Sequence, residues 1–378
     1  MNENNWRFVK KRTAADGAVY VSADGTRYRR TGGAELQAEA EFQRQIAGLD
    51  YPVPHVLEEG VTDDGHYYVV EESLGDQALH DRAVASLDGN RNLPDDVADT
   101  AAQVAARLLR AQAAHLVQPA PGTLRQWLDS AGFTQNVFQE NPDLDNTRTH
   151  AALEHALDHL GTVPLVRGHL DYGLPNVLPA GVIDWQHHGL VPLGYDVLPA
   201  LEIIAFKGGN KGYTASPGQR RRYLAALDDA SLNATGQPVT QNLGAYLLVK
   251  ALFFLALMRP TDPSRTDKHL KWQYRRHLFT KGLEQYERTG TVDTALFPAS
   301  KSSPLGTAPA TIRDRDYLLD RAGVIFKVIG DVHPGTHFLG YVKYYPDARG
   351  DRVLFGRTYR QNSVVSKAFG ILADRPEC

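Results

Sequence analysis

The residues best suited to chemistry lie in one short stretch, where His169, Asp171 and Asn176 are followed by Asp184 inside an apolar Val-Ile-Asp-Trp run. Phosphoryl transfer from a nucleotide to a hydroxyl needs these residue types. A carboxylate such as Asp171 can orient the hydroxyl and accept its proton, while Asn176 and Asp184 offer the hard oxygen ligands that Mg²⁺ prefers. The plain structural alternative is that Asp171 and Asn176 cap turns and that His169 is a buried core histidine.

A small β-rich unit precedes this stretch and occupies about the first 75 residues. Turn signals at residues 23–25 and 63–65 separate runs of alternating apolar residues, which predicts two hairpin-like strand pairs. Apolar residues at helical spacing predict one helix between the pairs. The expected elements are strands 18–22 and 26–30, helix 34–48, and strands 55–60 and 66–72.

The chain between residues 76 and 296 is mainly helical in pattern. An acidic first turn after Pro94 predicts a long helix at 95–117. The apolar run 243–258 is interrupted by Lys250 and is shorter than a membrane span, so we expect a buried helix there. The expected helices after 95–117 are 149–160, 217–229, 241–258, which contains this apolar run, and 266–288, with the β-rich stretch 164–184 between the first two of these.

The composition excludes several classes of protein. The length of 378 residues suggests two or three domains. The hydrophobic content of 42% is enough for each domain to have a core. A formal net charge of −3 argues against a nucleic-acid binder. The single cysteine, Cys378, excludes internal disulfides and cysteine metal clusters, and residues 1–11 lack the apolar core of a signal peptide. We expect a cytoplasmic protein with no nucleic-acid or membrane partner.

Residues 165–185 resemble the signature of the aminoglycoside phosphotransferase family, whose members share the protein-kinase-like fold. The family pattern is an apolar pair, a His-Gly-Asp triplet, four residues, an asparagine and then an apolar-Asp-Trp strand. In this chain Leu170 stands where glycine is usual. The resemblance implies catalytic roles for Asp171 and His169, with Asn176 and Asp184 as ligands of Mg²⁺ bound to ATP.

The resemblance extends more loosely over roughly residues 15–290. Glu39 is similar to the helix glutamate that pairs with a phosphate-gripping lysine. Residues 69–73 match the strand that runs into the hinge, where backbone groups bind adenine, which implies that Glu71 and Glu72 lie beside the nucleotide. The sequence Gly-Tyr-Asp ending at Asp196 is similar to the element whose aspartate braces the catalytic loop.

The strand lysine of the family is missing. This chain has Tyr28-Arg29-Arg30 there, and Arg29 is the best match because it follows an aromatic strand residue. Arg27 would face the same side under the two-residue period of a strand. An arginine can still grip phosphate oxygens as a charged fork. The turn expected to cover the phosphates has only one glycine, Gly17.

The residues expected to form the acceptor pocket, 190–300, carry fourteen Lys and Arg against nine Asp and Glu, a local net charge of +5. A polycationic aminoglycoside needs an acidic pocket, so this balance favours a neutral or anionic hydroxylated acceptor. The alternative is that these charges lie on solvated helix faces.

Residues 297–311 are rich in Pro, Ser and Ala and read as a linker. Beyond them, residues 313–371 resemble the amino-terminal segment of predicted nucleotidyltransferases, in motifs such as Gly330–Pro334 and Tyr341–Pro346. The paired acidic ligands of such transferases are missing, so we expect no nucleotidyl transfer. This β-rich module either docks a protein partner or the acceptor, or only covers part of the kinase surface.

The sequence therefore predicts an α+β protein with a bilobal protein-kinase-like fold and a small C-terminal β-rich module. The expected domains are an N-lobe at 1–75, a C-lobe at 76–296, a linker at 297–311 and the module at 312–378. The expected function is transfer of the γ-phosphoryl group of ATP to a hydroxyl of a small molecule. A nucleotide-binding pseudokinase that regulates a partner is the alternative. The missing strand lysine favours it, and the retained Asp171, Asn176 and Asp184 disfavour it.

Overall fold

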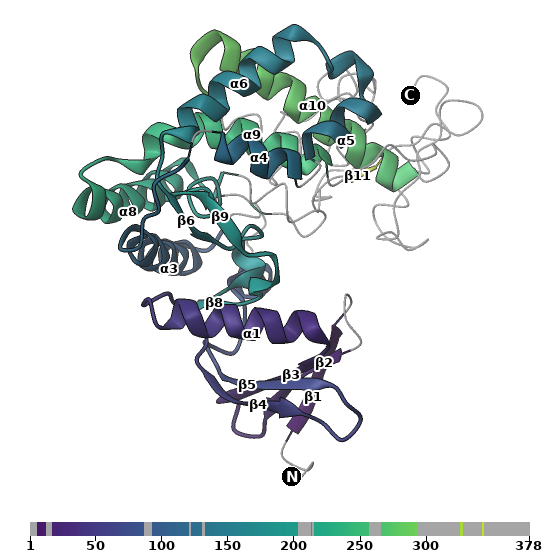
Figure 1. Cartoon of the computed structure of the whole chain (residues 1–378), viewed down its shortest axis with the longest axis vertical. Coiled ribbons are helices and arrows are strands. Elements are labelled where there is room, and N and C mark those ends of the chain that lie inside the picture. Colours follow the sequence, from purple (N-terminus) through teal and green to yellow (C-terminus); the bar gives the residue numbers. More distant parts are fainter. Residues whose placement is uncertain are drawn as a thin grey trace, which may run out of the picture.

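The described part of the chain forms two lobes, as the sequence predicts (Figure 1). The computed structural model describes residues 6–12, 17–86, 93–120, 122–130, 133–202, 213, 215–256, 266–292, 326–327 and 342–343. A five-stranded antiparallel sheet with one helix forms the N-lobe, and a mainly helical C-lobe follows. This is the bilobal kinase-like architecture.

The N-lobe sheet has the strand order β1-β2-β3-β5-β4. Its strands are β1 (Trp6–Arg12), β2 (Gly17–Ser22), β3 (Arg27–Gly32), β4 (Val56–Val61) and β5 (Tyr67–Glu72). Four of them match the predicted strands within two residues. The fifth, β1, was not predicted, because its sequence Trp-Arg-Phe-Val-Lys-Lys-Arg is exposed almost throughout and shows no alternation of apolar and polar residues.

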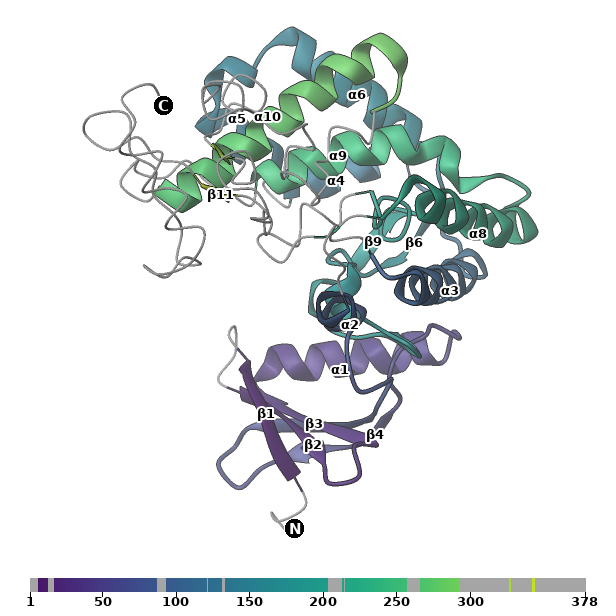
Figure 2. The same cartoon turned by 180° about the vertical axis from the view of Figure 1, so that it is seen from behind.

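Helix α1 (Ala34–Ala47) covers the face of the sheet that is turned toward the C-lobe (Figures 1 and 2). Its buried stripe follows helical spacing and includes the apolar Leu36, Ala40 and Ile46. The same stripe also buries two polar residues, Glu39 and Gln43. Because buried polar groups need partners, this stripe predicts a polar cluster between α1 and the sheet.

Strand β1 contains a bulge that turns its basic end toward α1. Phe8 lies opposite Tyr20 on β2, but Lys10 lies opposite Val19, so one extra residue, Val9, is inserted into β1. Val19 pairs with Arg30 on β3, on the inner face of the sheet, which is the face next to α1. Tyr20 pairs with Arg29 on the opposite, outer face. The extra residue therefore reverses the alternation of side chains after Val9, so that Lys10 and Arg12 lie on the same face as Arg30.

The C-lobe contains α2 (Leu79–Ala85), α3 (Asp95–Ala113), α4 (Thr123–Ser130), α5 (Phe133–Glu140), α6 (Thr147–Gly161), α8 (Pro217–Thr235), α9 (Leu243–Ala256) and α10 (Thr266–Thr289). Helix α3 packs against α8, while α9 packs against α5, α6 and α10 (Figure 2). The five long helices match the predicted ones, and the shorter α2, α4 and α5 were not predicted. The stretch Val239–Ala256 is apolar and long enough to cross a membrane, but it is 67% buried inside the protein.

Two short strand pairs lie at the junction of the lobes. Strand β6 (Leu165–Gly168) pairs with β9 (Gly189–Pro192), and β7 (Val177–Leu178) pairs with β8 (Gly181–Val182). These pairs hold the two loops that carry the predicted chemistry.

The hairpin of β7 and β8 is hydrogen-bonded directly to the N-lobe backbone. Val182 N donates to Pro52 O over 2.7 Å, and Ala180 N donates to Leu74 O over 3.0 Å. Gly181 allows this approach, because a Cβ at that position would lie 2.2 Å from Pro52 O. Main-chain contacts therefore fix one side of the lobe junction.

Four residues of the predicted C-terminal module are described. Strands β10 (Phe326–Lys327) and β11 (Val342–Lys343) pair antiparallel. The predicted linker, residues 297–311, and the rest of the module lie outside the described residues.

Candidate active site

Asp196 holds the start of the loop that carries the His-x-Asp sequence. Its buried carboxylate accepts hydrogen bonds from His169 N (2.7 Å) and Leu170 N (3.0 Å). Gly168 leaves room for it, because a Cβ there would meet Val191 at 2.2 Å and Asp196 at 3.0 Å. A carboxylate bonded to successive backbone N–H groups fixes the loop backbone, so Asp196 is a positioning residue.

His169 is fully buried behind the loop, with a relative exposure of 0%. Its Nε2 is 2.8 Å from Ile183 O, and burial lowers the pKa of its imidazole below the ordinary value. A neutral ring that donates to Ile183 O ties the loop to the residue that precedes Asp184. The catalytic role of His169 stays a prediction, and the burial of its side chain and its bond to Ile183 O favour a positioning role for it.

Two residues of the loops adopt the left-handed backbone conformation. Leu170 has φ +66° and Asp184 has φ +67°. A residue with a Cβ is strained there, and such strain gathers at functional sites. The glycine that Leu170 replaces in the family pattern would adopt this conformation freely.

Asp171 and Asn176 lie at the two ends of one turn. The side chain of Asp171 is exposed, and its backbone carbonyl accepts a hydrogen bond from Asn176 Nδ2 over 3.1 Å. Because the amide donates through nitrogen, its oxygen is directed elsewhere and can act as a ligand. The turn therefore carries a carboxylate and an amide, of which Asn176 lines the cavity between the lobes and Asp171 is not among its lining residues.

A cavity of about 430 Å³ lies between the lobes, and the predicted metal ligands Asn176 and Asp184 both line it. Glu71 and Glu72, at the end of β5, line the same cavity. Its apolar lining includes Val19, Leu74, Leu178 and Ile183. Apolar walls beside hinge backbone suit a planar base, and oxygen ligands at another part of the wall suit a metal-bound phosphate.

The predicted pair of Arg29 with Glu39 is not what the structure contains, because Arg30 occupies that place. Arg30 Nη1 donates to Glu39 Oε1 (2.5 Å), and Arg30 Nη2 donates to Glu71 Oε2 (2.9 Å). Gln43 Oε1 accepts a second bond from Nη2 over 3.2 Å. The inner face of β3 carries Arg30, so the expected register was wrong by one residue.

This cluster is charge-balanced by a second arginine. Arg12 Nη2 donates to Glu39 Oε2 over 3.1 Å. Burial alone would raise the pKa of Glu39, but Arg30 and Arg12 outweigh it and hold that pKa below the ordinary value. Burial would lower the pKa of Arg30, and Glu71 and Glu39 raise it above the usual value instead. Arg30 and Glu39 therefore stabilise each other's charged forms.

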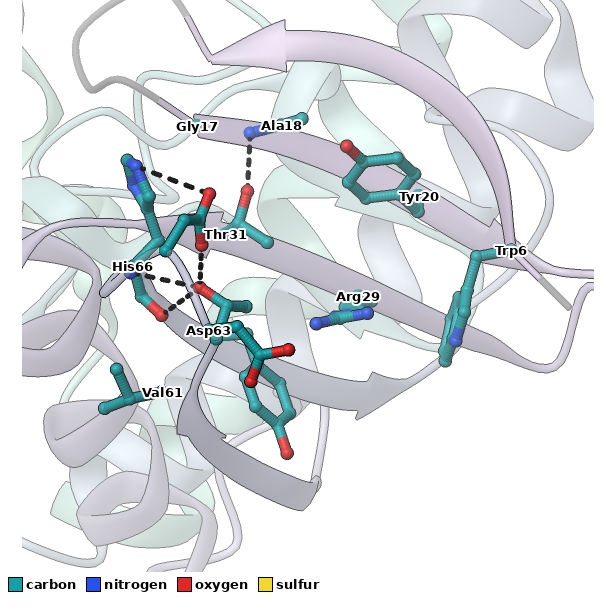
Figure 3. A pocket seen from close by; sticks show the side chains of 12 residues that line it. Trp6, Gly17, Ala18, Tyr20, Arg29, Thr31, Val61, Asp63 and His66 are labelled. Atoms are coloured by element: carbon teal, nitrogen blue, oxygen red, sulfur yellow. Dashed lines mark hydrogen bonds and ion pairs between the residues drawn. The ribbon is translucent and has the colours of Figure 1, made fainter. Parts of the chain in front are cut away.

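Arg29 points to the opposite face of the sheet, into a separate hollow of about 750 Å³ (Figure 3). Its guanidinium lies over the ring of Tyr68, 4.6 Å from the centroid, with Trp6 and Tyr20 on the same face. This hollow is larger than the cavity between the lobes, but it contains none of the residues of the His-x-Asp loop. The cavity between the lobes is therefore the candidate site.

Glu39 also connects the lobes. Its Oε1 accepts a hydrogen bond from Trp185 N over 3.2 Å, directly after Asp184. The position of Asp184 in the cavity is therefore coupled to α1, and through it to β1 and β3.

Sequence reasoning missed Arg12 and Gln43. The signal for Gln43 was its spacing of four residues from Glu39, which places both polar side chains on one buried helix stripe that requires charged or polar partners. Arg12 carried no comparable signal, because the bulge that aims it at α1 is not visible in the sequence.

The residues present fit a nucleotide with Mg²⁺. Magnesium commonly takes one or two protein oxygens and completes its shell with phosphate and water, and Asn176 and Asp184 supply two such groups on one wall. Within the described residues, no group of three or more His, Cys, Asp or Glu side chains could hold a metal by itself. A site completed by phosphate oxygens is consistent with both observations.

Comparisons with known proteins give a family and several similar structures. The model of the "Phosphotransferase enzyme family" matches residues 9–238. No curated protein matches the chain. A ternary complex of the aminoglycoside phosphotransferase APH(4)-Ia with AMP-PNP and hygromycin B is 18% identical, with a TM-score of 0.43, over 75% of this chain and 94% of that one.

Two further solved structures are similar at the same level. The GDP complex of an aminoglycoside 2'-phosphotransferase is 15% identical, with a TM-score of 0.43, over 75% of this chain and 92% of that one. A putative aminoglycoside phosphotransferase from Ralstonia eutropha is 16% identical, with a TM-score of 0.46, over 75% of this chain and 88% of that one.

Proposed function

We propose that this chain, which belongs to the phosphotransferase enzyme family, transfers the γ-phosphoryl group of ATP to a hydroxyl of a small molecule. The observation that carries the proposal is a cavity that both Asn176 and Asp184 line, beside the loop that also contains Asp171. Small-molecule phosphotransfer follows from the family. The nucleotide, the metal and the hydroxyl acceptor are the parts that we propose.

In the proposed reaction, Asp171 orients the acceptor hydroxyl and accepts its proton as the hydroxyl oxygen attacks the γ-phosphorus. Asn176 and Asp184 hold Mg²⁺, which would neutralise charge on the phosphates when bound. Asp196 and His169 keep the loop in place through the backbone bonds and the Ile183 contact described above. The exposed position of Asp171 allows an acceptor to approach it from solvent.

The decisive experiment tests Asp171 and Asp184 with different readouts. The Asp171→Asn variant should bind ATP as the wild type does, while ADP release with an accepted substrate falls by about two to four orders of magnitude. Equal turnover in the variant and the wild type would remove Asp171 from the reaction. Asp229→Asn, a change in an α8 residue outside this cavity, is the matched control and should leave turnover unchanged.

The Asp184→Asn variant should require more Mg²⁺ for half-maximal ATP binding, because one anionic ligand becomes neutral. An unchanged Mg²⁺ titration would mean that Asp184 is only a structural residue.

A non-catalytic nucleotide-binding protein is the second candidate. The observation that favours it is the cluster around Arg30, where the residue at the usual lysine position is bonded to two carboxylates. A screen of hydroxylated metabolites and antibiotics for ADP release separates the two candidates. Nucleotide binding without ADP release for any acceptor would favour the non-catalytic protein.

The charge of the acceptor is less constrained than the sequence suggests. Acids from other segments pair with part of the basic excess, since Arg222 lies 2.8 Å from Asp95, and Arg276 also pairs with Asp143. We therefore propose a hydroxylated small molecule without restricting its charge.

A further inference from the structure

The arginine at the position of the family lysine has few donors left for a ligand. Of the terminal donors of Arg30, one on Nη1 bonds Glu39, and the two on Nη2 bond Gln43 and Glu71. Its Nε is buried with no acceptor among the described residues. An arginine held by two carboxylates is a structural anchor, and a phosphate would have to displace a carboxylate to bind Nη2.

Strand β1 brings a second set of cations to the cavity. The bulge at Val9 places Lys10 opposite Val19 and Arg12 opposite Gly17, on the face that carries Arg30. Lys10, Lys11 and Arg12 all line the cavity that contains Asn176 and Asp184. Bulges next to active sites commonly re-aim a side chain in this way.

Both terminal nitrogens of Arg30 are bonded, whereas one terminal nitrogen of Arg12 has no hydrogen bond within the described part of the chain. Only Nη2 of Arg12 is bonded, to Glu39, and Nη1 is buried with no acceptor among the described residues. The side chain is 13% exposed. An unsatisfied buried donor on a cation is costly, and an anionic oxygen from a ligand would satisfy it.

The charges point the same way. Arg30, Glu39 and Glu71 together carry a net charge of −1, which repels phosphate, and Arg12 brings the cluster to zero. The exposed Lys10 and Lys11 add two further cations from β1 to a cavity that is also lined by the acids Glu72, Asp76 and Asp81. Without β1, the cluster would oppose the binding of a triphosphate.

From this geometry we infer that Arg12 is the phosphate-binding cation of the cavity, with Nη1 contacting a phosphate oxygen of the nucleotide while Nη2 remains bonded to Glu39. Arg30 serves instead as the anchor of Glu39 and Glu71. The inference rests on the proposed nucleotide site and adds to it the residue that grips the phosphates.

The test compares nucleotide binding with nucleoside binding by calorimetry. In the Arg12→Gln variant, the dissociation constant of ATP should rise about tenfold or more, because a charge-assisted hydrogen bond is lost. The dissociation constant of adenosine should not change. Glu39 keeps its bond to Arg30 in this variant, so the fold should persist. GTP and guanosine are titrated in parallel.

Arg7→Gln is the matched control, since Arg7 lies on the same strand with an exposed side chain and does not line the cavity. It should bind both ligands as the wild type does. If Arg12→Gln does not fold, Arg12→Lys is used, which keeps the charge without the fork and should weaken ATP severalfold with adenosine unchanged.

Equal weakening of ATP and adenosine would show that Arg12 acts through the fold and would overturn the inference. Unchanged ATP binding in the variant would overturn it as well. A wild-type protein that binds neither nucleotide would overturn the proposed function and the inference together.

Discussion

Leu170 combines backbone strain with side-chain packing. Its φ of +66° disfavours any residue with a Cβ, by about 1–2 kcal/mol. Its side chain nevertheless packs at the edge of the core, where a Cβ on Gly189 would lie 3.2 Å from Leu170 Cδ1. Replacing the leucine therefore changes two contributions to the free energy of unfolding, backbone strain and side-chain packing, which have opposite signs.

Leu170→Gly and Leu170→Ala separate these two terms. Both variants lose the packing, but only glycine relieves the strain. We expect the glycine variant to be more stable than the alanine variant by about 1 kcal/mol, the reverse of the usual order. Denaturant unfolding measures the difference. An alanine variant as stable as the glycine variant would show that position 170 is not strained.

The buried imidazole of His169 gives the fold a defined pH dependence. Burial lowers its pKa in the folded protein below the value of 6.5 expected for an unfolded chain. As the pH falls below about 6.5, the unfolded chain therefore takes up a proton that the folded protein does not. The free energy of unfolding should decrease by up to about 1.4 kcal/mol per pH unit until the folded pKa is reached.

His169→Gln removes this titration while keeping a donor for Ile183 O. Between pH 7 and pH 5, we expect a shallower loss of stability in this variant than in the wild type, measured by urea unfolding at each pH. His159→Gln, a change on the exposed side of α6, should keep the wild-type slope. Identical slopes in the wild type and His169→Gln would contradict the assignment.

At the scale of elements, α1 and β3 show what the sequence could and could not predict. The helix and its bounds followed from helical spacing, and the importance of Glu39 followed from the family resemblance. The partner did not, because a two-residue period fixes that alternate residues share a face but not which set is buried. Arg30 faces inward because it pairs with the fully buried Val69, and this depends on the assembled sheet.

The turn that contains Asp171 and Asn176 was easier to predict for a physical reason. Its residues act within a short segment, so their order alone brings Asp171 and Asn176 together in one turn. The cluster around Glu39 joins β1, α1, β3 and β5, and such long-range contacts leave no local pattern in the sequence. Arg12 is the clearest example, because its orientation depends on one extra residue in an exposed strand.

The cluster should behave as a single cooperative unit. Arg30→Met leaves two buried carboxylates without their main partner and should lower the free energy of unfolding by about 3–5 kcal/mol. The double variant Arg30→Met, Glu39→Met should cost less than the sum of the two single changes, because both disrupt one network. Additive costs in denaturant unfolding would contradict this coupling.

At the scale of the whole molecule, the predicted domain boundaries remain to be tested. The composition of residues 297–311 predicts that this segment is the first site of limited proteolysis in the full chain. The larger product, ending near residue 296, should bind ATP as the intact protein does, since the cavity is lined by residues from the two lobes. First cleavage within the lobes, or loss of ATP binding on cleavage, would contradict these boundaries.

The main-chain hydrogen bonds between the hairpin of β7 and β8 and the N-lobe allow the separation of the lobes to be measured by hydrogen exchange. The amide hydrogens of Ala180 and Val182 are held by carbonyls of the other lobe, Leu74 O and Pro52 O. They can exchange with deuterium only when that junction opens, so their exchange rates measure the free energy of opening. A nucleotide that binds both lobes should slow them together, and the factor of slowing would report how strongly it clamps the molecule shut, with no label attached.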